Sequence, residues 1–160
     1  MDMVQVNDLD GSVVEKMRTL PPPNDLQISR RVIGWNEYRL SQELKDFLLQ
    51  SFTESHGTFI KEGLPARQAP KEFKMKSLMQ FLPNDGFSVR PNTFVVLIPL
   101  FNSSTSAKFR TGTGEWHTLR WVPGTFIRIP SGTRGRDVGF DDPVPVYSLM
   151  IEVTLEAAGV

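Results

Sequence analysis

From about residue 72 onward, apolar residues recur at every second position or in short unbroken runs, and turn residues separate the runs. Residues 93–101 are almost all apolar, which favours a strand that is buried on both faces. Residues 116–121 and 125–129 predict two short strands, and residues 144–155 predict a long one. Several short strands at even spacing are typical of a sandwich or barrel, so we expect a mainly β fold.

The first 70 residues predict an arm and one helix. The prolines at positions 21–23 favour a stiff extended segment. Ser41 is a suitable N-cap for a helix over residues 41–54, with an apolar stripe at i, i+3, i+4 and i+8 formed by Leu44, Phe47, Leu48 and Phe52. We expect one domain over residues 1–160, made of an extended arm (1–34), a helical segment (35–70) and a β barrel (71–160).

Composition excludes several classes of protein. The chain contains no cysteine, so disulfides, thiolate metal sites and cysteine nucleophiles are excluded. The 18 basic residues balance the 18 acidic ones, which argues against nucleic acid as a partner, although a local basic patch would escape this test. No apolar run approaches the roughly 18 residues that span a bilayer, and the N-terminal residues show no secretory signal. We therefore expect a cytoplasmic protein without a membrane partner.

One segment carries a recognisable motif. Gly124, Pro130 and Gly132 are spaced as Gly, five residues, Pro, one residue, Gly. In physical terms, Gly124 turns the chain into a strand, Pro130 ends the strand and Gly132 makes the next turn. This spacing resembles the second sequence motif of the cupin superfamily, and the likeness covers about residues 94–155. The resemblance implies a cupin-like double-stranded β-helix, or jelly-roll barrel, and a homodimer as the expected assembly.

The departures from the cupin pattern concern the metal. A cupin has a histidine ligand three residues after the last glycine of the motif, where this chain has Gly135. The chain contains only His56 and His117, whereas a first-row metal site generally needs three convergent ligands. We therefore expect neither a metal nor another cofactor. The same shortage argues against a relative of the iron and 2-oxoglutarate oxygenases, whose barrel is similar and whose His-x-Asp…His triad is absent here.

His117 and Tyr147 are two candidates for a catalytic role. By alternation, His117 shares a strand face with Leu119 and Trp121, where a histidine could act as a general acid or base in an apolar pocket. The alternative is a packed or surface histidine. Tyr147 could offer its hydroxyl to the same pocket, or it could be a core tyrosine.

Arg128 is the third catalytic candidate. It lies within a strand on the face of Phe126, and a buried arginine needs an anionic partner. That partner is either Glu152 in the last strand or a carboxylate or phosphate of a ligand.

Four further residues are candidates for ligand binding. Arg134 and Arg136 flank Gly135 in an expected loop at the barrel mouth, where they could hold an anionic group or simply form a solvated turn. Trp116 and Trp121 flank His117 and could line the pocket. The tryptophans and basic residues do not alternate along the sequence as a single-strand binding surface would require.

Two functions remain open at the level of sequence. The first is a metal-independent cupin-like protein that binds a small organic molecule in its barrel. The cupin resemblance implies that such a protein could be an isomerase, cyclase or dehydratase of a biosynthetic pathway. The second is a non-catalytic dimerisation or protein-interaction module, which the absence of a recognisable catalytic set favours.

Overall fold

The structure is a computed structural model that describes residues 4–32, 34–64, 68–82, 86–101, 105–138 and 146–157. Its elements, in chain order, are β1 (Gln5–Asp8), α1 (Gly11–Met17), the 3-10 turn η1 (Pro23–Asp25), β2 (Ile28–Val32), β3 (Trp35–Tyr38), α2 (Gln42–Glu62), β4 (Gln68–Phe81), β5 (Phe87–Ser88), β6 (Thr93–Leu100), β7 (Thr105–Thr111), β8 (His117–Trp121), β9 (Thr125–Ile129), β10 (Thr133–Arg136) and β11 (Val146–Ala157).

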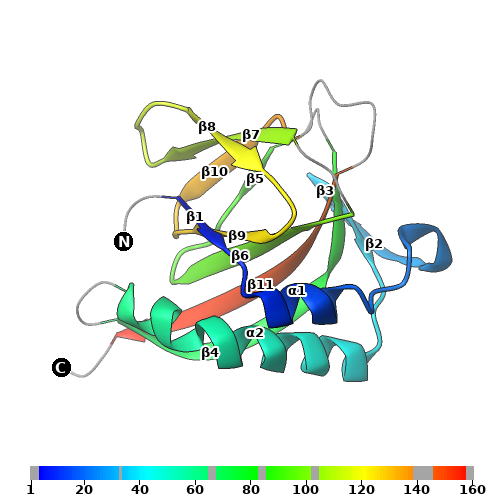
Figure 1. Ribbon diagram of the computed structural model, residues 1–160. Helices are drawn as coiled ribbons and strands as arrows, with labels where there is room; N and C mark the ends of the chain where they lie inside the picture. The colour runs from blue at the N-terminus through cyan, green and yellow to red at the C-terminus, as the bar shows by residue number, and fades with distance from the viewer. Residues whose placement is uncertain are drawn as a thin grey trace.

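The strands from β4 to β11 pair in a nested antiparallel order. β4 pairs with β11, β5 with β10, β6 with β9 and β7 with β8. This is the connectivity of a long hairpin folded over on itself, which is the jelly-roll arrangement. It produces a seven-stranded major sheet, in the order β1-β9-β6-β11-β4-β3-β2, and a four-stranded minor sheet, in the order β5-β10-β7-β8 (Figure 1). The predicted mainly β, cupin-like double-stranded β-helix is therefore confirmed.

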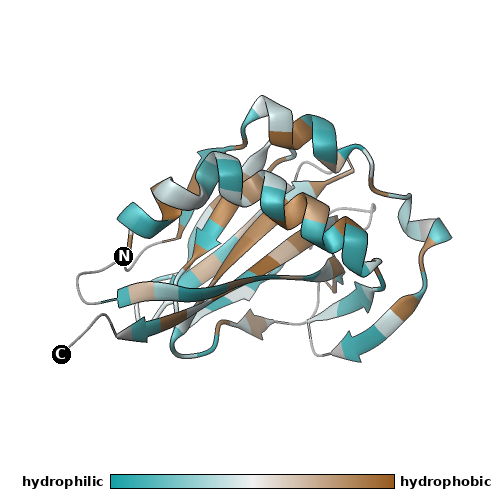
Figure 2. Cartoon of the chain, turned by 90° about the horizontal axis from the view of Figure 1, so that it is seen from below, coloured by the Kyte–Doolittle hydropathy of each residue, from teal (hydrophilic) through white to brown (hydrophobic). Residues whose placement is uncertain are grey.

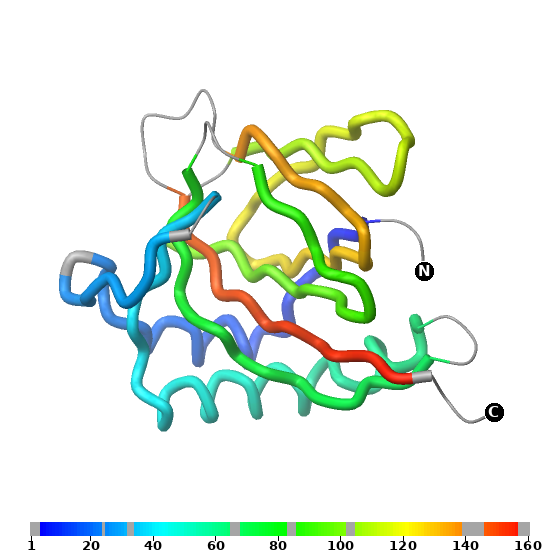
Figure 3. Tube along the Cα trace, turned by 180° about the vertical axis from the view of Figure 1, so that it is seen from behind, coloured from blue at the N-terminus to red at the C-terminus, as the bar shows by residue number. Residues whose placement is uncertain are grey.

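The longest pairing in the major sheet joins the two longest strands. β11 runs beside β4 from Val146 to Ala157, and the two strands follow each other closely along the Cα trace (Figure 3). Alternate side chains of β11 share the face that the helices cover. Leu149, Ile151 and Val153 are buried under the helices, and Tyr147 and Leu155 pack against them at either end.

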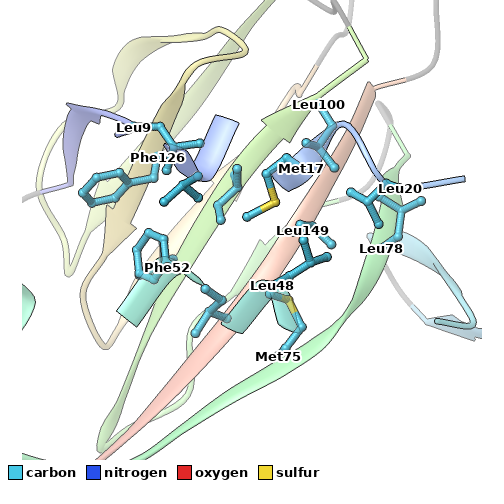
Figure 4. Close-up of a cluster of buried hydrophobic side chains, with 14 of the residues drawn as sticks. Leu9, Met17, Leu20, Leu48, Phe52, Met75, Leu78, Leu100, Phe126 and Leu149 are labelled. Carbon is cyan, nitrogen blue, oxygen red and sulfur yellow. The ribbon is translucent and has the colours of Figure 1, made fainter. Parts of the chain in front are cut away.

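Both helices cover one face of the major sheet, while the minor sheet covers the other. Their apolar sides turn toward the strands and their polar sides face outward (Figure 2). Leu48 and Phe52 of α2 meet Met17 of α1 and Phe126 of β9 in this first core (Figure 4). All eight residues of β6 are buried, as predicted, because this strand faces the helices on one side and the minor sheet on the other.

A second core lies between the two sheets and is rich in aromatic rings. Phe81 contacts Phe87 and Trp121 at ring-centroid distances of 5.5 Å and 5.1 Å. Phe87 also meets Phe109 of β7 edge to face at 6.1 Å. Edge-to-face pairs add stability beyond the apolar area that they bury, so this cluster fixes how the two sheets stack.

The helix α2 begins where the sequence predicted and extends further than predicted. Ser41 caps it by accepting a hydrogen bond from the Leu44 amide. The helix runs on through Gly57 to Glu62, past the predicted end at residue 54. Phe47, predicted on the buried stripe, is 44% exposed. The added two turns shift the buried stripe to include Gly57 and Ile60, and they place the helix end against Arg128 of β9.

The N-terminal arm is more structured than the sequence indicated. β1 pairs with β9 along the edge of the major sheet, and α1 packs its Val13 and Met17 into the first core. Asp10 caps α1 by accepting a hydrogen bond from the Ser12 amide. Neither helix that the structure describes is long and apolar enough to cross a membrane.

Candidate functional site

The structure does not bring the three predicted catalytic residues together. Arg128 of β9 and Tyr147 of β11 belong to the major sheet and face the helices, outside the space between the sheets. His117 belongs to β8 at the edge of the minor sheet. The catalytic assignments stay predictions, but the three side chains cannot act on one bound molecule.

Arg128 is 1% exposed and packs beneath the C-terminal end of α2. Its guanidinium donates a hydrogen bond to the Ile60 carbonyl at 3.4 Å and lies 5.4 Å and 5.8 Å from the ring centroids of Phe59 and Phe94. Burial lowers the pKa of this guanidinium. The proposed partner Glu152 instead pairs with Arg90. Arg128 therefore supports the helix end, where a cation compensates the unpaired carbonyls.

Tyr147 forms part of a small aromatic group on the helix-facing side. Its ring lies 6.0 Å from that of Tyr38 and 5.6 Å from that of Phe101. Burial, with a smaller contribution from Tyr38, raises the pKa of its hydroxyl. These surroundings are those of a structural tyrosine that anchors β11 to β3.

His117 lines a groove of about 440 Å³ at the open edge between the sheets. Val4, Phe109 and Leu119 form its apolar wall, and Thr111 and Glu115 stand at its rim. The predicted alternation along β8 is present, because His117 and Leu119 line the groove while Trp121 is buried further in.

The predicted ligand-binding residues divide between the two faces of the minor sheet. Trp121 is fully buried in the second core, so it cannot contact a ligand on the surface. Arg134 and Arg136 lie in strand β10 instead of a loop, and their side chains point outward, away from the space between the sheets. Trp116 lies on this same outward side.

Strand register gathers five cations on this outer face, which we call the basic face. Its members are Lys108 and Arg110 of β7, Arg120 of β8, and Arg134 and Arg136 of β10. Arg134 stands directly opposite Arg110, and Arg136 stands directly opposite Lys108. Among the residues that the structure describes, Asp137 is the acid that pairs with this group, at 3.8 Å from Lys108 Nζ and 3.7 Å from Arg136 Nε.

Trp116 completes the basic face with an aromatic surface. The guanidinium of Arg136 lies 3.9 Å from its ring centroid, and that of Arg110 lies 5.0 Å from it. Both contacts are cation–π interactions, which hold the two arginines and the ring in place relative to one another. The ring itself remains half-buried, so part of it faces solvent.

Sequence reasoning found Trp116, Arg134 and Arg136 but missed Lys108, Arg110 and Arg120. The missing residues alternate with apolar ones in β7 and β8, and this alternation was the available signal for an outward-facing cation row. What the sequence could not show is the pairing of β7 with β10, which places two cation rows side by side.

The position of the cupin histidine is closed by an aromatic ring. Gly135 pairs directly with Phe87 across the minor sheet. A Cβ atom added at Gly135 would lie 2.4 Å from the Phe87 ring, closer than any stable contact. The ring therefore occupies the space that a side chain at this position would need.

The two histidines are also too far apart to share a ligand. His56 of α2 packs on the helix-facing ring of Phe126 at 4.6 Å, whereas His117 lies in the minor sheet on the other side of the major sheet. Stacked sheets are about 10 Å apart, and metal–nitrogen distances are about 2 Å. The described residues contain no group of three metal-ligating side chains.

The fold is similar to that of two solved oxygenase structures. A prolyl-4-hydroxylase of Pseudomonas putida matches with a TM-score of 0.60 at 15% identity, over 95% of this chain and 91% of the other. A "Putative oxygenase from Shewanella oneidensis" matches with a TM-score of 0.55 at 13% identity, over 92% and 80%. The chain matches no protein-family model, and no curated protein sequence matches it. At these identities the likeness shows the fold.

These neighbours correct the functional prediction made from the sequence. The prediction of a metal-independent cupin that binds a small molecule in its barrel is contradicted, because the two similar solved structures are a prolyl-4-hydroxylase and a putative oxygenase. The described residues nevertheless do not fit a metal, since Phe87 covers Gly135 and the histidines lie on opposite sides of the major sheet. The fold is thus similar to that of oxygenases, while the described side chains supply no group of metal ligands.

Proposed function

We propose that this protein binds a phosphate-bearing polyanion on its basic face. The observation that carries this proposal is the pair of like-charged cross-strand contacts, Arg110 opposite Arg134 and Lys108 opposite Arg136. Apart from Trp116, the described outward-facing residues beside them are small and polar, so no acidic side chain among them interrupts the positive charge across the three paired strands.

Like charges directly opposite one another destabilise a sheet. Two such pairs stand next to each other here, and a single acid, Asp137, offsets them among the described residues. An anion bound between the cations would offset this repulsion and so stabilise the folded protein. A surface with no ligand would have no reason to keep two destabilising pairs of like charge.

The spacing of the cations suits a chain of phosphates. Neighbouring strands are about 4.8 Å apart, and outward-facing residues of one strand repeat at about 6.7 Å. Four of the five cations are arginines, and the planar guanidinium forms paired hydrogen bonds to phosphate oxygens. A flexible polyanion can therefore contact several cations in succession.

We also infer kinship with the cupin superfamily as part of this proposal. Gly124 has φ +88° before β9, Pro130 follows that strand, and Gly132 has φ +77° before β10. These are the turn, strand end and second turn that the motif requires. The jelly-roll connectivity and the motif together support the relationship.

Titration of the purified protein with linear inorganic polyphosphate, followed by calorimetry, tests the function. We expect binding that weakens as salt rises, because counterion release contributes to such contacts. Removing two cations in Lys108→Gln/Arg134→Gln should weaken binding about tenfold or more. The matched control is Arg30→Gln/Arg31→Gln, which removes two exposed cations from β2 at the far edge of the major sheet.

The two variants distinguish binding at the basic face from binding that depends only on net charge. If the control weakens binding as much as Lys108→Gln/Arg134→Gln, the binding depends on overall charge and the proposed site is wrong. Absence of polyphosphate binding by the unmodified protein at low salt would overturn the function itself.

A further inference from the structure

We propose that the polyanion is a single-stranded nucleic acid whose bases stack on Trp116. This inference rests on the proposed polyanion function and adds the recognition of bases to the recognition of phosphates. It departs from the expectation, drawn from the balanced net charge, that nucleic acid is not a partner.

Trp116 supplies a feature that phosphate binding does not need. Proteins that bind single strands combine a basic track for the backbone with aromatic side chains on which bases stack. On the basic face, the centroid of the half-buried indole ring lies 5.0 Å and 3.9 Å from the guanidinium carbons of Arg110 and Arg136. Guanidinium planes also stack on bases, so the three side chains form one stacking surface.

The shape of the face favours a single strand over a duplex. Reading a duplex groove requires a projecting helix or a two-stranded ribbon. The basic face is instead the broad side of β10, β7 and β8, and the two helices lie on the other side of the molecule (Figure 1). A broad sheet surface leaves bases of an unpaired strand free to lie flat against it.

The chemistry of the face disfavours an anionic membrane. Peripheral membrane binding buries several apolar side chains between the lipid headgroups. Apart from Trp116, the described outward-facing neighbours of the cations are Ser106 and Thr118, and Ser88 lies beyond Arg134. One indole ring among polar residues fits base stacking better than insertion into lipid.

The test compares two fluorescein-labelled oligonucleotides with equal numbers of phosphates. One is single-stranded oligothymidylate DNA, and the other is an abasic DNA strand of the same length. We expect fluorescence anisotropy to show about tenfold tighter binding of the base-bearing strand, because stacking of one base contributes on this scale. In Trp116→Ala the ratio of the two affinities should fall to about one, whatever the change in abasic affinity that follows from losing the contacts to Arg110 and Arg136, and Trp116→Phe should retain part of the difference.

Each failure has a distinct signature. Equal affinity of the unmodified protein for the base-bearing and abasic strands would overturn base recognition and leave the polyanion function standing. No binding of either strand or of polyphosphate would overturn both. Tighter binding to vesicles containing phosphatidylserine than to oligothymidylate would replace the nucleic acid with a membrane.

Discussion

At the scale of single residues, Gly135 and Phe87 determine what the space between the sheets can accept. The Phe87 ring covers the glycine so closely that a Cβ atom at position 135 would lie 2.4 Å from it. An aromatic side chain over a facing glycine stabilises an edge pair in a sheet. The same contact removes the room for a metal-binding side chain where the cupin motif would place one.

Gly135→Ala should lower the free energy of unfolding by about 1–3 kcal/mol, because the added methyl overpacks the core beneath Phe87. Urea denaturation measures the change. Gly11→Ala is the matched control, since nothing lies within 4 Å of the added atom at that helix start, and its stability should not fall. A Gly135→Ala protein as stable as the unmodified one would show that the ring does not occupy this space.

His56 provides a pH-dependent contribution to stability. Burial against Phe52 and Phe126 lowers its pKa below 6.5, although the nearby Asp10 carboxylate opposes the shift. Its Nε2 accepts a hydrogen bond from the Asp10 amide, which only an unprotonated nitrogen can do. The folded state thus binds fewer protons than the unfolded state between the two pKa values.

The stabilising effect of His56 is complete above about pH 6.5 and is lost as the pH falls through its lower, folded-state pKa. His56→Gln keeps an acceptor for the Asp10 amide and removes the titrating group. As the pH falls over this range, the free energy of unfolding of this variant should therefore decrease less than that of the unmodified protein. His117→Gln, at the exposed histidine, should keep the dependence of the unmodified protein. The interpretation would be wrong if both variants follow the same pH curve.

At the scale of elements, the end of α2 depends on a side chain from another strand. Arg128 donates to the Ile60 carbonyl, and a Cβ at Gly63 would lie 2.6 Å from the arginine Nη1. The glycine after the helix therefore makes room for the guanidinium. This contact explains why α2 extends beyond its predicted end at residue 54. Arg128 satisfies the Ile60 carbonyl, which a free helix end would leave to solvent.

Arg128→Ala should lower the free energy of unfolding by about 2–3 kcal/mol, since it opens a cavity and removes the helix partner. Arg128→Met should recover most of this loss by restoring the packing of the stem. Hydrogen exchange should be faster in the last turn of α2 in the alanine variant. Arg18→Met, on an exposed side chain of α1, should change neither quantity.

The elements that could be predicted are those with local signals. Alternation located β8 and β9, the unbroken apolar run located β6, and the Ser41 cap located the start of α2. The prediction that Phe47 is buried was wrong. The helix is longer than predicted, and its buried face is formed by Leu48, Ser51, Phe52, Gly57 and Ile60. The basic face could not be predicted, since it depends on the register that sets Arg134 opposite Arg110, 24 positions away in the chain.

At the scale of the whole molecule, five cations gather on one side although the charges of the full chain sum to zero. The outer side of the minor sheet carries the five cations of the basic face. The helix α2, on the opposite side of the major sheet, contains four acidic residues and two lysines. Such a dipolar distribution orients an approaching polyanion toward the basic face and accelerates productive encounters at low salt.

Arg134→Gln should have opposite effects on stability and on binding. Relief of the repulsion with Arg110 should raise the free energy of unfolding by about 0.2–1 kcal/mol, while polyphosphate affinity falls. The control is Arg31→Gln in β2, where Arg31 stands opposite the uncharged Asn36 of β3, and it should change neither property. A loss of stability in Arg134→Gln would show that these cations serve the fold, which would remove the main argument for a ligand.

The most direct test of the central claim is to locate bound polyphosphate on the protein by NMR, using amide chemical shifts of nitrogen-15-labelled protein. We predict that the largest shifts fall on β7, β8 and β10, around Lys108, Arg110 and Arg134, with α2 unchanged. Largest shifts on α2 or along the groove beside His117, or no shifts at low salt, would contradict the account.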